Sequence, residues 1–292
     1  MGSNKVAVLV LGMAGSGKST LMQGLKSYTS RHKLSSYFVN LDPAVRKTPA
    51  FEPNIDICDT VDYHELMKST KMGPNGAIMT SLNLYATKFN EVLSIIESKD
   101  VEFVFIDTPG QIEVFTWSAS GQLIAGALAS SMPVIILYAI DTVRSASPVT
   151  FASNMLYACS VMYRLRLPIV LAFTKTDLVA ADKAFEWISD PQVLADALQD
   201  DSRYLGSMST SMAFMLESVY SNLPVAGVSA VTSLGMDDVI EKIREARVTY
   251  NDVFLPELEK AKQLKAEKLA GKAEEAYRSW EDDWKADQGM DF

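Results

Sequence analysis

The sequence predicts an α/β fold, in which helices cover both faces of an open, doubly wound and mostly parallel sheet. Short apolar runs of strand length are rich in Val and Ile and lack clean polar alternation, as expected of strands buried on both faces. Helix-length segments separate these runs, which is the alternating order of parallel α/β folds. A polar motif follows each run, at the strand ends where such sheets bind ligands. The six runs span residues 6–11, 36–41, 101–106, 133–140, 168–173 and 224–229.

One main domain accounts for most of the 292 residues. It is predicted over residues 1–250, with a helical insertion at about 179–223 in which Asp190 caps a helix that starts at Pro191. Beyond the main domain the chain becomes highly charged and favours helix. Residues 251–292 are therefore predicted to form a charged C-terminal helical extension.

Composition narrows the function classes. A hydrophobic content of 48% suits a globular protein with a sizeable core. The net charge of −9 argues against direct nucleic-acid binding, which needs a basic surface. The two cysteines, Cys58 and Cys159, form neither a disulfide framework nor a metal-ligand spacing, so we expect buried thiols in a reducing compartment.

Residues 114–140 carry no Asp, Glu, Lys or Arg and are long enough to span a bilayer. They also contain several serines, a glutamine and Pro133, and the motifs on either side must meet at one site. We therefore expect a loop, a buried helix at about 119–129 and a core strand at 133–140 instead of a membrane span.

The first apolar run leads into GMAGSGKS, residues 12–19, which matches the pattern G-x-x-x-x-G-K-[ST] between a strand and a helix. The glycines let backbone N–H groups surround a di- or triphosphate, and Lys18 reaches the β and γ phosphates. The Ser19 hydroxyl is a predicted Mg²⁺ ligand. The plain alternative is a glycine-rich turn with a surface lysine.

The third apolar run ends at Asp107, which Thr108, Pro109 and Gly110 follow as a turn. A carboxylate at this strand end suits Mg²⁺, held directly or through water. The turn would bring the Gly110 N–H close to the γ-phosphate. By itself such a turn is an ordinary loop, and the phosphate-binding loop beside it favours the functional interpretation.

TKTD, residues 174–177, follows the fifth run and predicts which base is bound. Guanine presents adjacent N1–H and 2-amino donors that the Asp177 carboxylate can accept, whereas adenine lacks this pair. The Lys175 stem would lie along the base, and SAVT, residues 229–232, would turn the Ala230 N–H toward the guanine oxygen. GTP and GDP are therefore the predicted ligands. The predicted nucleotide-binding residues are Gly12, Met13, Ala14, Gly15, Ser16, Gly17, Lys18, Ser19, Thr20, Gly110, Thr174, Lys175, Asp177, Ser229, Ala230 and Val231.

These motifs, together with NLDPA (40–44), GPN (73–75) and DTPGQIE (107–113), resemble those of the GPN-loop GTPases, a P-loop NTPase family of nucleotide-dependent dimers. The resemblance covers residues 6 to about 250 and is greatest to the larger eukaryotic paralogue, which is linked to assembly and nuclear import of RNA polymerase II. It implies a homodimer, or a heterodimer with a GPN paralogue, whose partners are RNA polymerase II subunits or assembly factors. It also implies a cytoplasmic protein that shuttles to the nucleus.

The GPN segment lies at about residues 71–80. By composition alone, Gly73-Pro74-Asn75-Gly76 predicts a plain turn. The resemblance implies that this loop crosses a two-fold interface and places Asn75 against the partner's phosphates in trans, where a GTPase needs added donors. Pro74 would stiffen the loop, while Gly73 and Gly76 would permit backbone angles closed to larger residues.

Asp42, at the end of the second strand, is the leading candidate to act on the attacking water. The resemblance implies such a role or a metal-linked one, and a helix cap is the alternative. Gln111 and Glu113 would orient water or couple the site to the dimer interface, and a structural salt bridge is the alternative for Glu113. The predicted catalytic residues are Asp42, Gln111, Glu113, Asn75 in trans and Lys18, and the predicted metal ligands are Ser19, Asp107 and Asp42.

Met208, Met212 and Met215 fall on one face of a helix in the insertion. Core packing is the plain explanation, and a nucleotide-gated groove for a client peptide is the functional one. The motifs predict a Mg²⁺-dependent GTPase, and the resemblance implies a slow switch that acts as a chaperone-like assembly factor. A GTP-binding scaffold with incidental hydrolysis and a small-molecule kinase are the alternatives, although the arginine-rich lid of such kinases is not evident.

Overall fold

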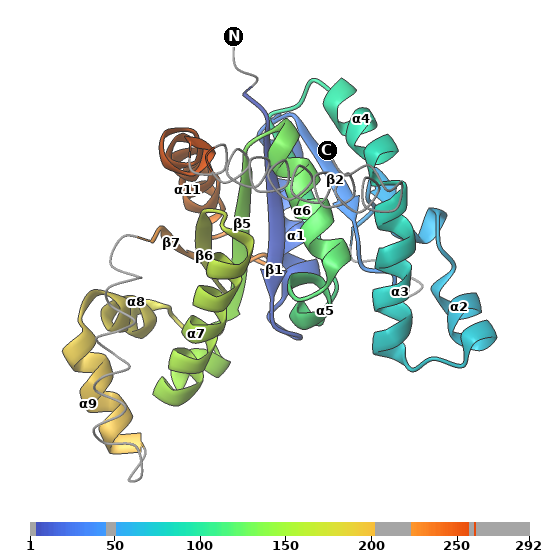
Figure 1. Ribbon diagram of the computed structural model, residues 1–292. Helices are drawn as coiled ribbons and strands as arrows, with labels where there is room; N and C mark the ends of the chain where they lie inside the picture. Colours follow the sequence, from blue (N-terminus) through green and yellow to red (C-terminus); the bar gives the residue numbers. More distant parts are fainter. Residues whose placement is uncertain (1–3, 45–50, 202–222, 257–259, 261–292) are drawn as a thin grey trace, which may run out of the picture. The chain divides into compact units, whose positions relative to one another are not determined.

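The computed structural model describes residues 4–44, 51–201, 223–256 and 260 (Figure 1). The chain divides into two compact units, Met1–Tyr250 and Asn251–Phe292. The sheet and the candidate site both belong to the first unit.

The strands of the described residues form one seven-stranded sheet in the order β3-β2-β4-β1-β5-β6-β7, and every pairing is parallel. The predicted doubly wound α/β fold is therefore confirmed. All six predicted strands exist within two or three residues of their expected ends, and β3 is a short addition that the sequence did not reveal. The strands are β1 Val6–Gly12, β2 Ser36–Asn40, β3 Ile55–Asp56, β4 Phe103–Asp107, β5 Val134–Asp141, β6 Ile169–Thr174 and β7 Val225–Val228.

Helices follow most strands, as the alternating pattern predicts. A five-residue π-helix, Tyr250–Phe254, continues directly from the last helix of the first unit. The α-helices are α1 Lys18–Arg31, α2 Tyr63–Thr70, α3 Pro74–Thr87, α4 Phe89–Ser98, α5 Ile112–Thr116, α6 Ala119–Ser131, α7 Pro148–Leu165, α8 Asp182–Ser189, α9 Pro191–Asp201 and α11 Met236–Thr249, and short 3-10 turns lie at Ile57–Asp59 and Arg144–Ala146.

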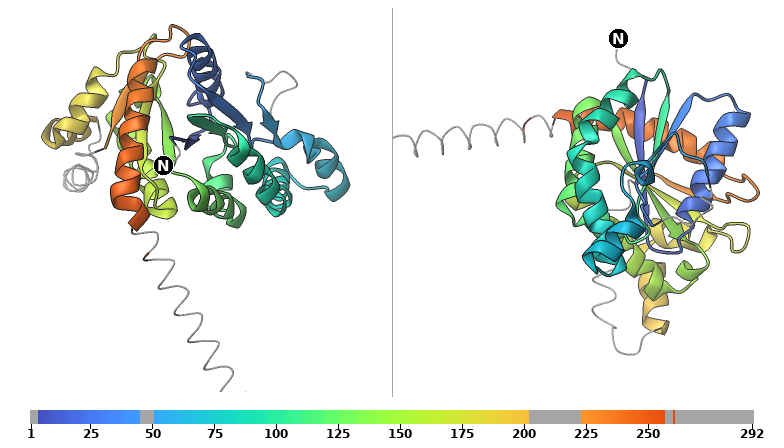
Figure 2. Two further views of the ribbon diagram at one scale, coloured as in Figure 1. Left: turned by 90° about the horizontal axis from the view of Figure 1, so that it is seen from above. Right: turned by 90° about the vertical axis from the view of Figure 1, so that its right-hand side faces the viewer.

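The two faces of the sheet are covered by different helices. On one face, a continuous apolar core joins α1 and α11 to side chains of β1, β4 and β5, including the fully buried Val8 and Leu137. On the other face α6 and α7 pack against β5, with α3 beside α6 (Figures 1 and 2). Burial on both faces explains why the strand sequences lack polar alternation.

Residues 112–141 contain more helix than the sequence predicts. The expected loop after residue 114 is wrong in part, because α5 occupies Ile112–Thr116. The Ser118 hydroxyl then accepts from the Gly121 N–H at 3.0 Å and caps α6, and β5 follows as expected. None of the helices in the described residues is long and apolar enough to cross a membrane.

The described part of the insertion, α8 and α9, shows the predicted helix start. The Asp190 carboxylate accepts from the backbone N–H of Gln192 at 2.9 Å, and α9 begins at Pro191. Such a cap satisfies an N–H group that has no partner within the helix. The predicted client groove, Met208, Met212 and Met215, lies outside the described residues.

The two cysteines differ from expectation. Cys58 is exposed and Cys159 is half-buried, so the prediction of two buried thiols is wrong. Cys58 lies in the 3-10 turn after β3, a strand that the sequence pattern did not predict, which is why its exposure was not foreseen.

Candidate functional site

The candidate site is built where the carboxyl ends of the central strands meet. In the register of the sheet, Asp107 of β4 lies opposite both Val10 of β1 and Asn40 of β2. On the other side of β1, Asp141 of β5 lies opposite Thr174 of β6. Parallel pairing therefore brings the motifs that follow these strands to one edge of the sheet.

The phosphate-binding loop connects β1 to α1. Gly12 begins it with a φ of 152°, and a Cβ at this position would lie 2.4 Å from the Ala139 carbonyl oxygen of the neighbouring strand. Gly17 caps α1 with a φ of 88° and no side-chain hydrogen bond, which leaves the first N–H groups of the helix free. Free N–H groups at a helix N-terminus form an anion site, as the motif predicts.

Lys18, the first residue of α1, is a buried cation at the mouth of this loop. Its side chain is 6% exposed, and its Nζ donates to the carbonyl oxygens of Gly12 at 2.8 Å and Met13 at 3.2 Å. Burial lowers the pKa of Lys18, and the charges of Asp107 and Asp42 oppose this shift. Among the described residues the Lys18 ammonium has hydrogen bonds only to carbonyl oxygens, which makes it electrostatically suited to an incoming polyphosphate.

Asp107 is a buried carboxylate with little compensation. It is 4% exposed, and Oδ1 accepts from the backbone N–H of Thr108 at 3.0 Å. Its other carboxylate oxygen accepts no hydrogen bond from any residue that the structure describes. Burial raises the pKa of Asp107 to about 7, and the charge of Lys18 works against the rise. A carboxylate left in this state suits a cation.

Asp42 lies beside Asp107 and is already hydrogen-bonded. Its Oδ1 accepts from the Ala44 N–H at 3.0 Å, and its Oδ2 accepts from the Gly110 N–H at 3.3 Å. The Gly110 N–H, which we expected to face the γ-phosphate, is therefore directed to Asp42. The Asn40 side-chain amide also bonds both backbone groups of Asp42 and fixes its position. Burial raises the pKa of Asp42.

The side chains of Gln111 and Glu113 make few interactions with the described residues. Gln111 precedes α5 and makes no side-chain cap. Glu113 is exposed, and its Oε1 accepts from the Tyr157 hydroxyl at 3.3 Å. Among the described residues Glu113 has no ion pair, so the structural salt bridge considered for it is not seen.

A pocket lies between the loops that follow β6 and β7, where the motifs predict base binding, and it is the candidate base pocket. Its volume is about 200 Å³, and apolar side chains of Leu21, Leu178 and Val228 form part of its wall. Asp177 lines it as an exposed carboxylate. The structure thus brings together, in one pocket, residues predicted from three separate motifs: Gly17, Thr20, Thr174, Lys175, Asp177, Ala230 and Val231.

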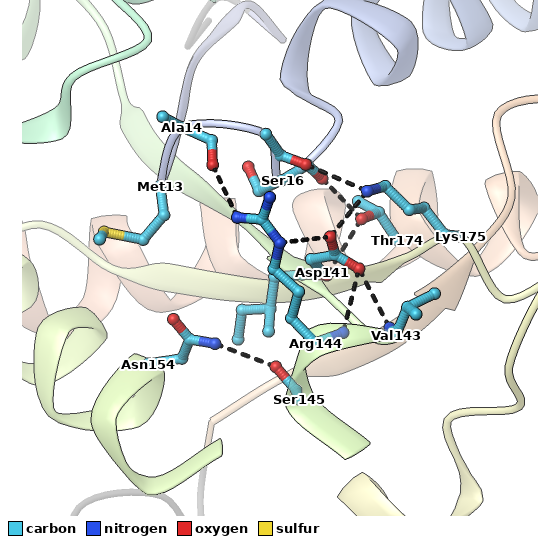
Figure 3. A network of polar contacts seen from close by, with 12 residues as sticks. Met13, Ala14, Ser16, Asp141, Val143, Arg144, Ser145, Asn154, Thr174 and Lys175 are labelled. Carbon is cyan, nitrogen blue, oxygen red and sulfur yellow. Dashed lines mark hydrogen bonds and ion pairs between the residues drawn. The ribbon is translucent and has the colours of Figure 1, made fainter. Parts of the chain in front are cut away.

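Two residues of TKTD also bind the phosphate-binding loop directly. The Thr174 hydroxyl donates to the Ser16 carbonyl at 2.6 Å, and the Lys175 Nζ donates to the Gly15 carbonyl at 3.1 Å. Lys175 also pairs with the buried Asp141 carboxylate at 2.7 Å (Figure 3). The base-binding loop and the phosphate-binding loop are therefore connected.

Sequence reasoning missed several residues of this site. Asp141 was visible as the acid that ends the fourth run, but no motif assigned it a role. Arg144 had no signal, because its contact with Ala14 depends on the turn after β5 (Figure 3). Leu21 and Leu178 line the base pocket as part of ordinary helix and loop sequence.

The GPN segment is mostly helix, which corrects the predicted loop. Gly73 caps α3 with φ −70° and ψ 166°, and Pro74 is its first residue. These angles are open to any residue, and Gly76 lies within the helix, so the conformational reason that we expected for both glycines is wrong. Asn75 is exposed in the first turn, and its side chain has no hydrogen bond to any residue that the structure describes.

A glycine-rich loop that joins the first strand of a parallel sheet to a helix, with a buried lysine at its mouth, defines a P-loop nucleotide-binding protein. A family model described as a conserved hypothetical ATP binding protein matches residues 10–249. The chain is also 49% identical to GPN-loop GTPase 1 of Dictyostelium discoideum, over 94% of this chain and 69% of that protein. The chain belongs to the GPN-loop GTPase family.

Two further comparisons agree with this family. GPN-loop GTPase 1 of Saccharomyces cerevisiae is 45% identical over 89% of this chain and 71% of its own length. The crystal structure of a GTPase from Pyrococcus abyssi in its apo form superposes with a TM-score of 0.72 at 30% identity, covering 84% of this chain and 98% of the other.

Proposed function

We propose that the protein is a Mg²⁺-dependent GTPase that works as a dimer, in which Asn75 of each protomer completes the site of the other. We also propose that it uses the GTP cycle as an assembly and import factor for RNA polymerase II. Hydrolysis of GTP is the activity of its family, and the residues of this chain contribute to it through base recognition, metal binding, phosphate binding and water positioning.

Guanine is favoured over adenine by the chemistry of the base pocket. The apolar wall suits the faces of a purine, and the Asp177 carboxylate at the pocket accepts both the N1–H and the 2-amino group of guanine. Adenine would leave Asp177 without these donors, at a cost that polar recognition sites use to reject analogues. This argues for GTP even though the matching family model is described by ATP.

The residues at the phosphate edge fit a magnesium ion. Asp107 is buried and short of hydrogen-bond donors, and Ser19 is exposed at the start of α1. Mg²⁺ needs few protein ligands, because this ion keeps waters and phosphate oxygens in its coordination sphere. Ser19 and Asp107 would hold the ion, with Asp42 nearby. When bound, it would neutralise charge on the transferring phosphoryl group.

The chain's own groups divide the remaining work. Lys18 and the free N–H groups of α1 bind the phosphates and stabilise the charge that develops on them. Burial makes Asp42 a better proton acceptor, because it raises the pKa of the carboxylate. Asn40 and Gly110 hold Asp42 in one orientation, which is what a group that positions water requires.

Completion in trans rests on one observation: Asn75 is presented by a rigid helix start and has nothing to bind among the described residues. A Cβ added to Gly73 would meet no atom of the described residues within 4 Å, so none of them packs directly against this position before Asn75. Met72 and Met79 beside it are 41% and 45% exposed. An amide donor flanked by exposed apolar side chains is suited to a subunit interface.

Complementation tests this mechanism. Asn75→Ala and Lys18→Ala should each reduce GTP hydrolysis about 100-fold or more, since each removes a group that stabilises phosphoryl charge. A randomly mixed population should recover about a quarter of the wild-type rate, because half of its dimers are mixed and each mixed dimer keeps one intact site of two.

The matched control is Asn83→Ala, an exposed asparagine on the same helix. Asn83→Ala should hydrolyse GTP at close to the wild-type rate without a complementing variant chain. If Asn75→Ala and Lys18→Ala chains form mixed dimers that remain inactive, Asn75 does not act in trans and the proposed completion of the partner's site fails.

The role in RNA polymerase II assembly and import is supported by similarity to GPN-loop GTPase 1 proteins. It requires a protein that is present in the cytoplasm and shuttles to the nucleus. Cells in which Lys18→Ala replaces the wild type should accumulate polymerase subunits in the cytoplasm, as seen by immunofluorescence. Normal nuclear polymerase in such cells would contradict the role and leave the GTPase mechanism untouched.

A further inference from the structure

A third cation, besides Lys18 and Lys175, lies against the phosphate-binding loop, and the motifs do not account for it. Arg144 begins the 3-10 turn that follows β5. One of its terminal nitrogens donates to the Ala14 carbonyl at 3.2 Å. Its guanidinium also packs on the next residue, because a Cβ added to Gly15 would lie 3.1 Å from the other terminal nitrogen. The guanidinium therefore binds the Ala14 carbonyl, as Figure 3 shows, and lies close to Gly15.

Asp141 fixes this arginine. It is the last residue of β5, it is 5% exposed, and its Oδ2 lies 3.5 Å from the Arg144 Nε. Its Oδ1 accepts from the backbone N–H groups of Val143 and Arg144 at 3.0 and 3.4 Å, which holds the start of the turn. The same Oδ2 lies 2.7 Å from the Lys175 Nζ. One buried carboxylate thus anchors two cations.

The two cations bind successive carbonyls of the loop. Arg144 binds that of Ala14, and Lys175 binds that of Gly15 at 3.1 Å. In a trans peptide the C=O of one residue and the N–H of the next point in opposite directions. A carbonyl held toward Arg144 therefore turns the Gly15 N–H to the other side of the loop. This N–H makes no hydrogen bond with the described residues, whereas that of Ser16 donates to Met13 at 3.1 Å.

We propose that Arg144, anchored by Asp141, is a positioning residue for the phosphate-binding loop, which holds the Ala14 carbonyl so that the Gly15 N–H faces the phosphates of the nucleotide. The inference requires that the loop binds phosphates, and it is independent of dimer formation and of Asn75. Gly15 has a φ of 81°, and glycine allows more than one orientation of the peptide that precedes it. A contact from outside the loop, such as that of Arg144, can therefore select one orientation.

We expect the ion pair between Arg144 and Asp141 to contribute little to folding stability. Arg144 has a side chain that is 63% exposed, and exposed ion pairs add little to folding. The hydrogen bond from Arg144 to the Ala14 carbonyl is sufficient to favour one peptide orientation over another. We therefore expect an effect on phosphate binding of about fivefold, with little change in thermal stability.

The test separates phosphate binding from base binding. Purified full-length Arg144→Ala should bind GDP about fivefold more weakly than the wild type, while guanosine binding, followed by saturation-transfer NMR, changes less than about twofold. Arg244→Ala is the matched control, since Arg244 also forms an exposed ion pair, with Glu102 at 2.8 Å. It should leave both affinities unchanged.

Two further variants test the mechanism. Arg144→Gln keeps an N–H donor for the Ala14 carbonyl without the charge, so it should recover much of the GDP affinity. The double variant Asp141→Asn/Arg144→Ala should bind GDP no more weakly than Asp141→Asn alone, because Arg144 acts through its anchor.

Three results would overturn the proposal. Arg144→Ala could match Arg244→Ala, so that Arg144 has no role. Guanosine affinity could fall as much as GDP affinity, which would indicate general damage to the site. Finally, Arg144→Gln could bind GDP as weakly as Arg144→Ala, and the loss of affinity could vanish as salt rises from about 0.05 to about 0.5 M. That result would indicate simple attraction between the charge of Arg144 and the phosphates.

Discussion

At the scale of single residues, the site depends on charges held away from water. Lys18 and Asp107 are 6% and 4% exposed, and each has few hydrogen-bond partners among the described residues. Isolated burial of this kind is unfavourable, so it persists where a ligand supplies the missing charge. The opposite directions of their pKa shifts, downward for the lysine and upward for the carboxylate, have the same cause in burial.

We propose that Asp177 determines which base is bound, so its substitution should change the nucleotide that the protein prefers. Asp177→Asn should weaken GTP binding at least about 100-fold, since the amide nitrogen faces donors of guanine. Xanthine nucleotides should bind better than before, because their 2-oxo group accepts from that amide. Competition between GTP and XTP measures the change, with Asp182→Asn on the neighbouring helix as a control that should prefer GTP. An unchanged preference in Asp177→Asn would place base recognition elsewhere.

Tyr85 should make stability depend on pH at the alkaline end. It is 1% exposed, its hydroxyl has no hydrogen-bond partner among the described residues, and burial raises its pKa. A raised pKa leaves stability intact below the unfolded value of about 10 and reduces it as pH rises above that value.

The free energy of unfolding of Tyr85→Phe should therefore lie within about 1 kcal/mol of the wild-type value at neutral pH. Near pH 10.5 the variant should be the more stable of the two proteins. Thermal denaturation at both pH values tests this. Tyr138, also buried with a hydroxyl that lacks a partner among the described residues, should retain part of the pH dependence in the variant. If the wild type and Tyr85→Phe lose the same stability between the two pH values, burial of Tyr85 does not affect its titration.

At the scale of elements, the way in which segments join decides where functional groups point. Pro74 starts α3 with a φ suited to a first helical position, so the GPN segment is a capped helix end with a defined direction. The base pocket depends on another junction, the turn between β7 and α11. There the Ser229 N–H donates to the Leu234 carbonyl at 2.9 Å, and the Ser229 hydroxyl accepts from the Thr232 N–H at 3.2 Å.

Gly235 ends this turn and should not tolerate a side chain. Its φ is 73°, and a Cβ would lie 1.8 Å from the Gly227 carbonyl oxygen, which is backbone and cannot move aside. Gly235→Ala should lose about 2 kcal/mol or more of folding stability and bind GDP more weakly. Gly126→Ala is the control: a Cβ there meets nothing within 4 Å, and alanine favours helix by about 1 kcal/mol. Chemical denaturation measures the unfolding free energies of Gly235→Ala and Gly126→Ala. Equal unfolding free energies for the two variants would contradict the predicted clash.

At the scale of the whole molecule, the sheet and the site both lie in the unit Met1–Tyr250. Tyr250 itself is 1% exposed, and its hydroxyl donates to the Ala129 carbonyl at 3.1 Å. We therefore propose that residues 1–250 form a nucleotide-binding domain and residues 251–292 a separate extension.

A chain that ends after Pro256 should fold, melt cooperatively and bind GDP with the full-length affinity. Saturating GDP, at about 100 times its dissociation constant, should stabilise both chains by about 2.7 kcal/mol. Lys18→Ala in either chain should show much less stabilisation. Failure of the shortened chain to fold would show that the first unit depends on residues beyond 256.

Local sequence was sufficient for the strands and for the glycine-rich loop between β1 and α1, because buried parallel strands and phosphate loops impose composition at fixed spacing. The base-binding role of TKTD stays a prediction. Local sequence was not sufficient for β3, which is two residues long, or for α5, whose five residues are too few for a periodic signal. It also misread the GPN segment, because glycine, proline and asparagine are favoured both in turns and at helix starts.

Long-range contacts could not be predicted in the same way. Asp42 binds Gly110 from 68 residues away, and Arg144 reaches Ala14 across 130 residues. Such contacts arise when parallel register brings the ends of separate strands to one edge, and no local pattern records which side chains then meet. The short motifs thus predict the chemistry of the site, while its connections exist only in the folded sheet.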